Sequence, residues 1–255
     1  MNAEQRRKAI ANYVLDRGDA RIDELVEEFG VSRMTIHRHV EELSRQGVVR
    51  KLHGSVSAQP SGVYESLFSF RQTRATGVKQ ALAAEALKEI APGEVILMDD
   101  STTASAMGPM LSQKTPLNVV TNSLGLAAKL VQVDEISLLS LGGDYHPTYN
   151  AFIGHLCENA LSGLKVNTLI CSTSAVDEGM ALIQDPAVTR VKQAMMRAAQ
   201  RKILLVDSEK FGKVALHAFA PLSDFDLVIT DEDLDAAQSA TLRTEGVNLR
   251  QVPRP

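Results

Sequence analysis

The chain has 255 residues, with 27 basic and 31 acidic side chains and a formal net charge of −4 at pH 7. This length suffices for one large or two modest domains, and the acidic balance excludes a general binder of polyanions. Hydrophobic residues make up 44% and charged residues 23%, which is ordinary for a globular protein. Residues 31–54 differ from the rest, because they carry a net charge of +3 and leave −7 on the remainder.

The sequence carries no signal for a membrane, metal or cofactor partner. Its apolar runs are too short to span a bilayer, and charged residues interrupt positions 4–8, where a signal peptide needs an apolar core. We therefore expect a cytoplasmic location. Cys157 and Cys171 form no CxxC pair, and the six histidines lack metal-ligand spacing, so we expect two buried thiols and no metal site.

The first part of the chain predicts three helices. Apolar side chains recur at helical spacing over residues 4–15 and again over residues 22–29. Gly30 is suited to end the second helix because glycine adopts positive φ without strain. Ser32 is then placed to cap the third helix.

The third helix has two contrasting faces. Ile36, Val40 and Leu43 recur at i, i+4 and i+7 and predict one buried stripe. At about 100° per residue, the opposite face is mostly basic and has a hydroxyl on its flank. Its members are Met34, Arg38 and Arg45, with Thr35 and His37 on the flanks. A short helix of this kind suits the major groove of DNA.

Residues 48–56 follow this helix and predict two short strands with a turn at His53-Gly54. The order of helix, turn, capped helix and basic hairpin favours a winged DNA-binding module over an ordinary helical corner with a solvated charged face. We expect the wing to reach backbone phosphates. The residues expected to contact DNA are Ser32, Arg33, Thr35, His37 and Arg38 on the helix, and Arg50, Lys51 and His53 on the wing.

The remainder of the chain predicts an α/β domain. Loop composition over residues 57–62 marks the boundary, and a helix is predicted over residues 79–90. Apolar runs without strict alternation then alternate with helical stretches, which predicts a doubly wound, mostly parallel sheet buried on both faces. The expected strands are 95–98, 118–120, 136–141, 168–171, 203–206, 227–229 and 247–249. The expected domains are 1–57 and 79–255, with a connecting arm over 58–78.

Polar residues follow five of these strands. In an open α/β sheet the ligand crevice lies at the carboxyl ends of the strands, so these loops converge on one rim. A single such loop is most often a helix cap or a turn, but five together favour a binding site. The residues expected there are Asp99, Asp100, Ser101, Thr102, Thr103, Thr121, Asn122, Ser123, Gly142, Gly143 and Lys210.

The chemistry of this rim suits a phosphorylated ligand. The segment 101–103 opens a helix, where N–H groups, hydroxyls and the helix dipole favour an anion. We expect Lys210 to supply a compensating positive charge. Asp99, Asp100 and Asp207 would bind sugar hydroxyls.

Short motifs occur in a specific order along nearly the full length of the chain. In the N-terminal part they are Val31-Ser32-x-x-Thr35-Ile36-x-Arg38, Leu43, Gly47 and His53-Gly54. In the C-terminal part they are Tyr64-Glu65, Arg71, Asp99 with Thr102-Thr103, Val120-Thr121-Asn122-Ser123, Gly142-Gly143, Gly154, Val191-Lys192, Asp207-x-x-Lys210-Phe211-Gly212 and Ile229-Thr230-Asp231. In these motifs the chain resembles the DeoR-type transcriptional regulators. The resemblance implies a winged-helix reader joined to a sensor domain similar to phosphosugar isomerases. Such regulators usually repress sugar-catabolic genes and respond to a phosphorylated sugar.

The chain departs from the family pattern at several positions. His37-Arg38-His39 stands where the family usually has Arg-Arg-Asp, which implies an altered base preference because these positions face or flank the groove. Serine replaces glycine in the wing at Ser55 and before the two threonines at Ser101. Cys171 and Ser174 replace the glycines of a later rim loop. These changes bear on the identity of the effector more than on the fold.

We therefore expect a sequence-specific regulator, a repressor of sugar or polyol catabolic genes, that binds double-stranded operator DNA and a small phosphorylated sugar. Operators read by winged helices are commonly repeated or palindromic, so a homo-oligomer, dimer or tetramer, is expected. The alternative is an isomerase-type enzyme carrying a DNA-binding module, with the rim carboxylates and Lys210 moving protons. No carboxylate pair has isomerase spacing, so no catalytic residue is assigned. A non-specific nucleoid protein conflicts with the acidic body.

Overall fold

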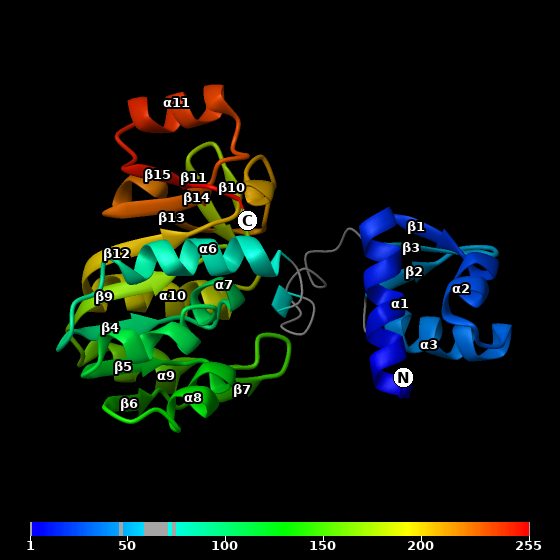
Figure 1. Ribbon diagram of the computed structural model, residues 1–255, viewed down its shortest axis with the longest axis horizontal. Coiled ribbons are helices and arrows are strands. Elements are labelled where there is room, and N and C mark those ends of the chain that lie inside the picture. The colour runs from blue at the N-terminus through cyan, green and yellow to red at the C-terminus, as the bar shows by residue number, and fades with distance from the viewer. Residues whose placement is uncertain (1, 46–47, 59–70, 73–74, 255) are drawn as a thin grey trace. The chain divides into compact units, whose positions relative to one another are not determined.

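The computed structural model describes residues 2–45, 48–58, 71–72 and 75–254 (Figure 1). Contacts between residues divide the chain into two compact units, residues 1–71 and residues 72–255. Most of the expected connecting arm, including Tyr64-Glu65, lies outside the described residues, as does Gly47. No described helix combines the length and the apolar character needed to cross a bilayer.

The described residues of the N-terminal unit form three helices and a three-stranded antiparallel sheet. Its elements are α1 (Ala3–Arg17), β1 (Asp19–Arg21), α2 (Ile22–Phe29), α3 (Arg33–Arg45), β2 (Val49–Lys51) and β3 (Ser55–Ala58). The strands lie in the order β1-β3-β2. Strand β1 was not expected, because residues 17–19 predicted only the end of a helix. Asp19 pairs with Ser57, so β1 joins the wing to the helices.

Local sequence explains how α3 begins and which face it buries. Gly30 ends α2 at φ 60°, and Ser32 caps α3 by accepting a hydrogen bond from Thr35 N at 3.2 Å. Ile36, Val40 and Leu43 are buried in one cluster with side chains of α1, α2 and the sheet, which confirms the predicted stripe.

The expectation that His39 flanks the groove is wrong, because this side chain is only 4% exposed. At about 100° per residue, position 39 lies about 40° beyond position 43 around the helix axis, at the edge of the buried stripe. His39 is therefore not placed to contact a base.

The C-terminal unit is built on a seven-stranded sheet in which every adjacent pair of strands is parallel. The order is β15-β14-β12-β9-β4-β5-β6. The strands are β4 (Val95–Met98), β5 (Leu117–Thr121), β6 (Ile136–Ser140), β9 (Val166–Cys171), β12 (Ala199–Leu205), β14 (Leu227–Asp231) and β15 (Leu249–Val252). A strand lies at each of the seven expected places, and β4 has the expected limits. Strands β6 and β12 end one residue earlier than expected, and β15 overlaps its expected range only at Leu249.

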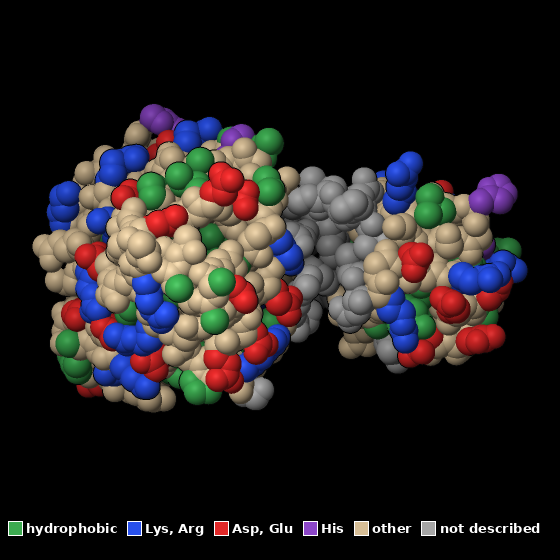
Figure 2. Space-filling view, turned by 90° about the horizontal axis from the view of Figure 1, so that it is seen from above, with side chains coloured by type: hydrophobic (Ala, Val, Ile, Leu, Met, Phe, Trp, Pro, Cys, Tyr) green, Lys and Arg blue, Asp and Glu red, His purple; other side chains and the backbone are tan. Residues whose placement is uncertain are grey.

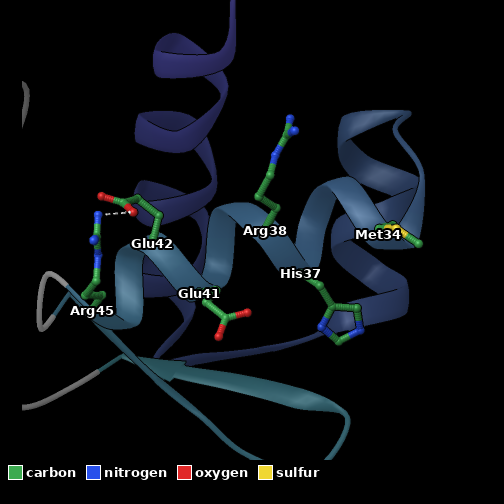
Figure 3. A pocket seen from close by; sticks show the side chains of 6 residues that line it. All are labelled: Met34, His37, Arg38, Glu41, Glu42 and Arg45. Carbon is green, nitrogen blue, oxygen red and sulfur yellow. Dashed lines mark hydrogen bonds and ion pairs between the residues drawn. The ribbon is translucent and has the colours of Figure 1, made fainter.

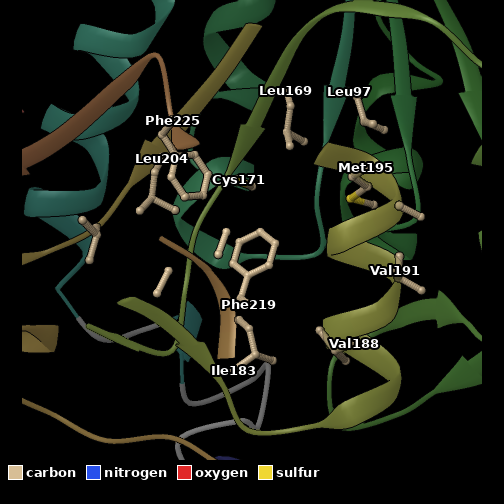
Figure 4. Packing of buried hydrophobic residues seen from close by; sticks show 14 of the residues in the cluster. Leu97, Leu169, Cys171, Ile183, Val188, Val191, Met195, Leu204, Phe219 and Phe225 are labelled. Atoms are coloured by element: carbon tan, nitrogen blue, oxygen red, sulfur yellow. The ribbon is translucent and has the colours of Figure 1, made fainter. Parts of the chain in front are cut away.

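Helices cover both faces of this sheet, so the doubly wound architecture is confirmed. One face packs against α6 (Thr76–Leu87), α7 (Thr102–Ser105), the 3-10 helix η1 (Gly108–Lys114) and α8 (Leu124–Leu130). The other packs against α9 (His155–Ser162), α10 (Pro186–Ala198) and α11 (Ala236–Thr244). Leu97 belongs to one core, whereas its neighbours Ile96 and Met98 belong to the other. Figure 4 shows the core that contains Leu97, around α10 and Phe219.

Two small antiparallel sheets, which the sequence did not predict, accompany the main sheet. One pairs β7 (Asp144–His146) with β8 (Ala151–Ile153). The other contains β10 (Ala175–Asp177), β11 (Met180–Ile183) and β13 (His217–Pro221). Short 3-10 helices follow β12 and β13: η2 (Ser208–Lys210) and η3 (Leu222–Asp224). The bridge between Val176 and Phe211 brings β10 beside the loop that carries Lys210.

Candidate functional site

The outer face of α3 is an open surface with a mixed lining. An open pocket along this helix is lined by Met34, His37, Arg38, Glu41, Glu42 and Arg45 (Figure 3). Met34 is 80% exposed, and His37 and Arg38 are exposed as well. Arg38 therefore has the position that a base-contacting arginine requires, in the middle of an exposed helix face.

The other residues expected to contact DNA surround this face within the N-terminal unit. The hydroxyls of Ser32 and Thr35 lie 2.9 Å apart at the start of α3. Arg33 forms an ion pair with Asp23 at 3.3 Å, so its charge is partly compensated within the protein. Lys51 of β2 lies 3.7 Å from Glu41. Arg50 and His53 are exposed on the wing.

His39 is a titratable group on the opposite side of α3. Burial lowers the pKa of His39 below its ordinary value, and the charges of Arg38, Arg6 and Arg7 lower it further. Its Nε2 is buried without a hydrogen-bond partner among the described residues. The folded unit therefore favours the neutral form of this imidazole more than the unfolded chain does.

The N-terminal unit should lose stability as the pH falls below about 6.5, the ordinary pKa of histidine. Below that pH the unfolded chain takes up a proton at His39 that the folded chain resists, so protonation favours unfolding. The limiting slope is about 1.4 kcal/mol per pH unit. Denaturant unfolding of wild type and His39→Gln between pH 7.5 and 5 measures this, since the variant lacks the proton site. His37→Gln on the exposed face is the matched control. An identical pH profile for wild type and His39→Gln would contradict the assignment.

The polar rim of the C-terminal unit lies at the point where the order in which strands are added to the sheet reverses. The chain runs outward through β4, β5 and β6, then returns to place β9 on the other side of β4. Loops that leave β4 and β9 therefore diverge to opposite faces, which is where open α/β sheets bind ligands. The predicted loops after β4, β5, β9 and β12 all leave the same edge of this sheet.

Asp99 organises the point between β4 and β9. Its carboxylate has no exposed surface and accepts hydrogen bonds from Ser101 N and Ser172 N at 3.0 Å each. The Ser101 hydroxyl and the Lys192 ammonium also donate to it. These four donors occupy the lone-pair sites of a carboxylate. Asp99 thus holds neighbouring loops together instead of presenting oxygens to a sugar.

Lys192 is a component of the site that the sequence reasoning did not assign. It lies on α10, is 3% exposed, and forms an ion pair with Asp99. It also donates to the Ser172 carbonyl at 2.9 Å and lies 5.9 Å from the Phe219 ring centre. Burial opposes its charge, but the nearby carboxylates of Asp99 and Asp100 outweigh burial and raise the pKa of Lys192.

A sequence signal for this buried lysine exists. Val188, Val191 and Met195 form the buried stripe of α10, and position 192 falls inside it at i+4 from position 188. A lysine within an apolar stripe indicates a buried, paired charge, because an unpaired one would be too costly.

Lys210 is paired within the protein. Its ammonium lies 3.3 Å from Asp207 Oδ2 and 3.3 Å from the Ser172 hydroxyl, and its side chain is 21% exposed. Burial acts to raise the pKa of Asp207, but the charges of Lys210 and Lys79 lower it overall. Lys210 therefore lies beside the loop that follows β9 and already has a carboxylate partner.

The segment after β5 is fastened to the β7–β8 hairpin. Asn122 donates from Nδ2 to Phe152 O at 3.0 Å, and Phe152 N donates to Asn122 O at 2.9 Å. Gly143 is required here, because a Cβ would lie 2.4 Å from Ile153 O and its φ is 147°. Ser123 caps α8. Thr121 accepts a hydrogen bond from Ser123 N at 3.0 Å. Thr121, Asn122 and Gly143 thus have structural roles, whereas Gly142 is exposed.

The helix that starts at Thr102 completes the rim. Ser101 caps it by accepting a hydrogen bond from Ala104 N at 3.1 Å, so its hydroxyl is engaged with the protein on both sides. Thr102 is 8% exposed, and Asp100 and Thr103 are more deeply buried. Of the residues expected in this segment, Thr102 therefore keeps the most exposed surface. Figure 2 shows acidic and basic side chains interspersed on the visible surface of the C-terminal unit.

Two family descriptions match the chain. The DeoR-like helix-turn-helix domain matches residues 6–61, and the DeoR C terminal sensor domain matches residues 74–232.

Similarity to individual proteins extends over nearly the whole chain. The HTH-type transcriptional regulator YulB of Bacillus subtilis is 32% identical over 98% of this chain and 96% of its own length. The glycerol-3-phosphate regulon repressor of Escherichia coli is 29% identical over 91% of this chain and 92% of its own. The lactose phosphotransferase system repressor of Staphylococcus epidermidis is 28% identical over 91% and 94%.

Proposed function

The chain belongs to the DeoR family of DNA-binding transcriptional regulators, and we propose that it represses sugar or polyol catabolic genes under the control of a phosphorylated sugar. Two relatives named above are repressors, one of a lactose phosphotransferase system and one of a glycerol-3-phosphate regulon. We further propose a homo-oligomer, dimer or tetramer, because winged-helix operators commonly repeat.

One observation carries this proposal. A single chain joins an exposed, partly basic recognition helix to a parallel sheet that has polar loops at its switch point, where the loops after β4 and β9 leave to opposite faces. Arg38 and His37 on α3 are exposed for base contacts, and Arg50, Lys51 and His53 on the wing would bind backbone phosphates. The net charge of residues 31–54 is +3, which favours approach to DNA.

The phosphate is best accommodated between the start of α7 and the loop that carries Lys210. Thr102 is the first residue of α7 and follows the Ser101 cap. Lys210 donates to Ser172, at the end of the strand next to β4. A phosphate between them would accept charge-assisted hydrogen bonds, with the lysine shared between phosphate and Asp207. Asp99, Ser101 and Lys192 would orient these groups without contacting the sugar.

Two substitutions should abolish the response to the effector. Thr102→Asp places a like charge beside the phosphate, and Lys210→Ala removes the cation. Wild type should show a melting temperature that rises with the concentration of one sugar phosphate, because the ligand binds the native state. The sugar phosphate should stabilise neither variant. Both should still bind operator DNA, because the DNA-binding residues lie in the separate N-terminal unit.

Thr241→Asp, at an exposed position on α11, is the matched control and should respond as wild type does. The melting temperatures without ligand show whether each variant folds. Stabilisation of Thr102→Asp and Lys210→Ala equal to that of wild type would place the phosphate elsewhere.

The alternative activity is sugar-phosphate isomerisation, and the geometry favours it less. Proton transfer next to a carbonyl needs an accessible base whose pKa lies near the operating pH. Asp99 is buried against Lys192, and the pKa of Asp207 is lowered. Turnover of a pentose or hexose phosphate by the full chain, lost in Asp100→Asn or Lys210→Ala, would favour the enzyme.

A further inference from the structure

We propose that Met34 and Glu41 read bases in the major groove, Met34 through a thymine methyl group and Glu41 through a cytosine amino group. This inference rests on the proposed DNA-binding function and extends base reading beyond the basic and hydroxyl residues of α3. It follows from three properties of the helix: the line on which these side chains lie, the exposure of an apolar group, and the unequal engagement of two adjacent glutamates.

Met34, Arg38 and Glu41 lie along one line of α3. At about 100° per residue, positions 34, 38 and 41 fall within about 60° around the helix axis. Figure 3 looks onto this face, with Arg38 between the other two side chains along the helix. The buried stripe of Ile36 and Val40 lies on the opposite side. If Arg38 reaches a base edge, Met34 and Glu41 approach the same groove.

No described residue of the N-terminal unit covers Met34. The side chain is 80% exposed at the start of α3, where recognition helices contact base edges. Thymine presents the only methyl group in the major groove, and apolar side chains recognise it. A flexible thioether adapts to such a contact and excludes water from the methyl group.

The two glutamates of α3 differ in what they contact. Glu42 is turned toward Arg45, with which it forms an ion pair at 2.6 Å. Glu41 remains 76% exposed and has Lys51 at the longer distance of 3.7 Å. A carboxylate in the groove is repelled by phosphates unless a donor meets it, and the amino group of cytosine is such a donor. Lys51 lies beside it on the wing and offsets that repulsion.

The spacing along the helix sets the spacing of the bases. Seven residues separate Met34 from Glu41, which corresponds to a rise of about 10 Å. This equals about three steps of duplex DNA at 3.4 Å each. The proposal therefore places a thymine and a cytosine about three base pairs apart in each half-site, with the base read by Arg38 between them.

The experiment uses the full chain and a random pool of duplex DNA, from which wild type selects its preferred site. Each thymine of that site is then replaced by deoxyuridine, which removes only the methyl group. We expect one position at which wild type loses about fourfold in affinity, the value of one buried methyl-sized group. Met34→Ala should bind the two duplexes equally, whereas Met34→Leu should keep part of the preference.

Glu41→Gln tests the second contact, with Glu42→Gln as its matched control. A wrong base pair at the cytosine should weaken wild type by about fivefold to 150-fold, the usual cost of one mismatch. Glu41→Gln should lose most of that discrimination at this position alone, and Glu42→Gln should keep it.

The outcomes separate this proposal from the function on which it rests. Enrichment of no sequence by wild type would contradict the proposed function itself. An enriched site that is insensitive to deoxyuridine at every thymine would overturn the role of Met34. Discrimination at cytosine that survives in Glu41→Gln, or is lost equally in Glu42→Gln, would overturn the role of Glu41.

Discussion

Lys192→Met is expected to lower the free energy of unfolding of the C-terminal unit by about 3–5 kcal/mol, the usual cost of breaking a buried ion pair from one side. Methionine keeps the length of the side chain but removes the charge, so Asp99 remains buried without its cation. The Ser172 carbonyl also loses its donor. Denaturant unfolding of the full chain measures the change in the transition of the C-terminal unit.

Two further variants distinguish the loss of the pair from the loss of a lysine. Lys129→Met, at an exposed position on α8, should change stability by less than about 0.5 kcal/mol. The double variant Asp99→Asn with Lys192→Met should recover part of the loss, because no uncompensated charge remains. If Lys192→Met is no more destabilising than Lys129→Met, the ion pair between Asp99 and Lys192 does not stabilise the loops after β4 and β9.

Arg38→Ala is expected to reduce affinity for the selected operator by about 1–3 kcal/mol, which is about fivefold to 150-fold. Its guanidinium lies mid-helix on the exposed face, where it can donate two hydrogen bonds to the O6 and N7 atoms of guanine. The preference at one position of the site should relax at the same time. Fluorescence anisotropy with operator and with random duplexes measures both quantities at fixed salt.

Arg38→Lys separates charge from geometry. Lysine keeps the charge but lacks the planar fork of arginine, so specificity should fall more than non-specific binding. An equal loss of Arg38→Ala on operator and on random DNA would make this residue a phosphate contact. No loss on either would remove it from the interface.

The fold of the N-terminal unit was largely predictable because its sequence signals act between residues close together in the chain. The apolar spacing of Ile36, Val40 and Leu43, the glycine before α3 and the Ser32 cap each act within a few residues. Strand β1 was missed because its pairing with β3 joins positions 38 residues apart, such as Asp19 and Ser57. His39 was misplaced because a polar residue within a helix was taken to face outward, although its spacing places it in the core.

In the C-terminal unit, the order of helices and strands was predictable. Which polar residues of the rim form hydrogen bonds and ion pairs within the protein was not. Apolar runs locate strands, and parallel connections place their ends on one edge. Whether a polar group at that edge faces a ligand depends on partners distant in sequence. Asp99 and Lys192 are 93 positions apart, and the hydrogen bonds between Asn122 and Phe152 link residues 30 positions apart. Three-residue strands such as β7 and β10 carry too few residues for alternation to be recognised.

Control by a phosphorylated effector is tested by measuring the affinity of the full chain for its selected operator with a panel of sugar phosphates at fixed ionic strength. We expect at least one sugar phosphate to change operator affinity by about fivefold to 150-fold, a coupling of about 1–3 kcal/mol. The unphosphorylated sugar should have no effect. Thr102→Asp should bind operator normally and lose the change. Operator affinity that is the same with every sugar phosphate would contradict control by such an effector.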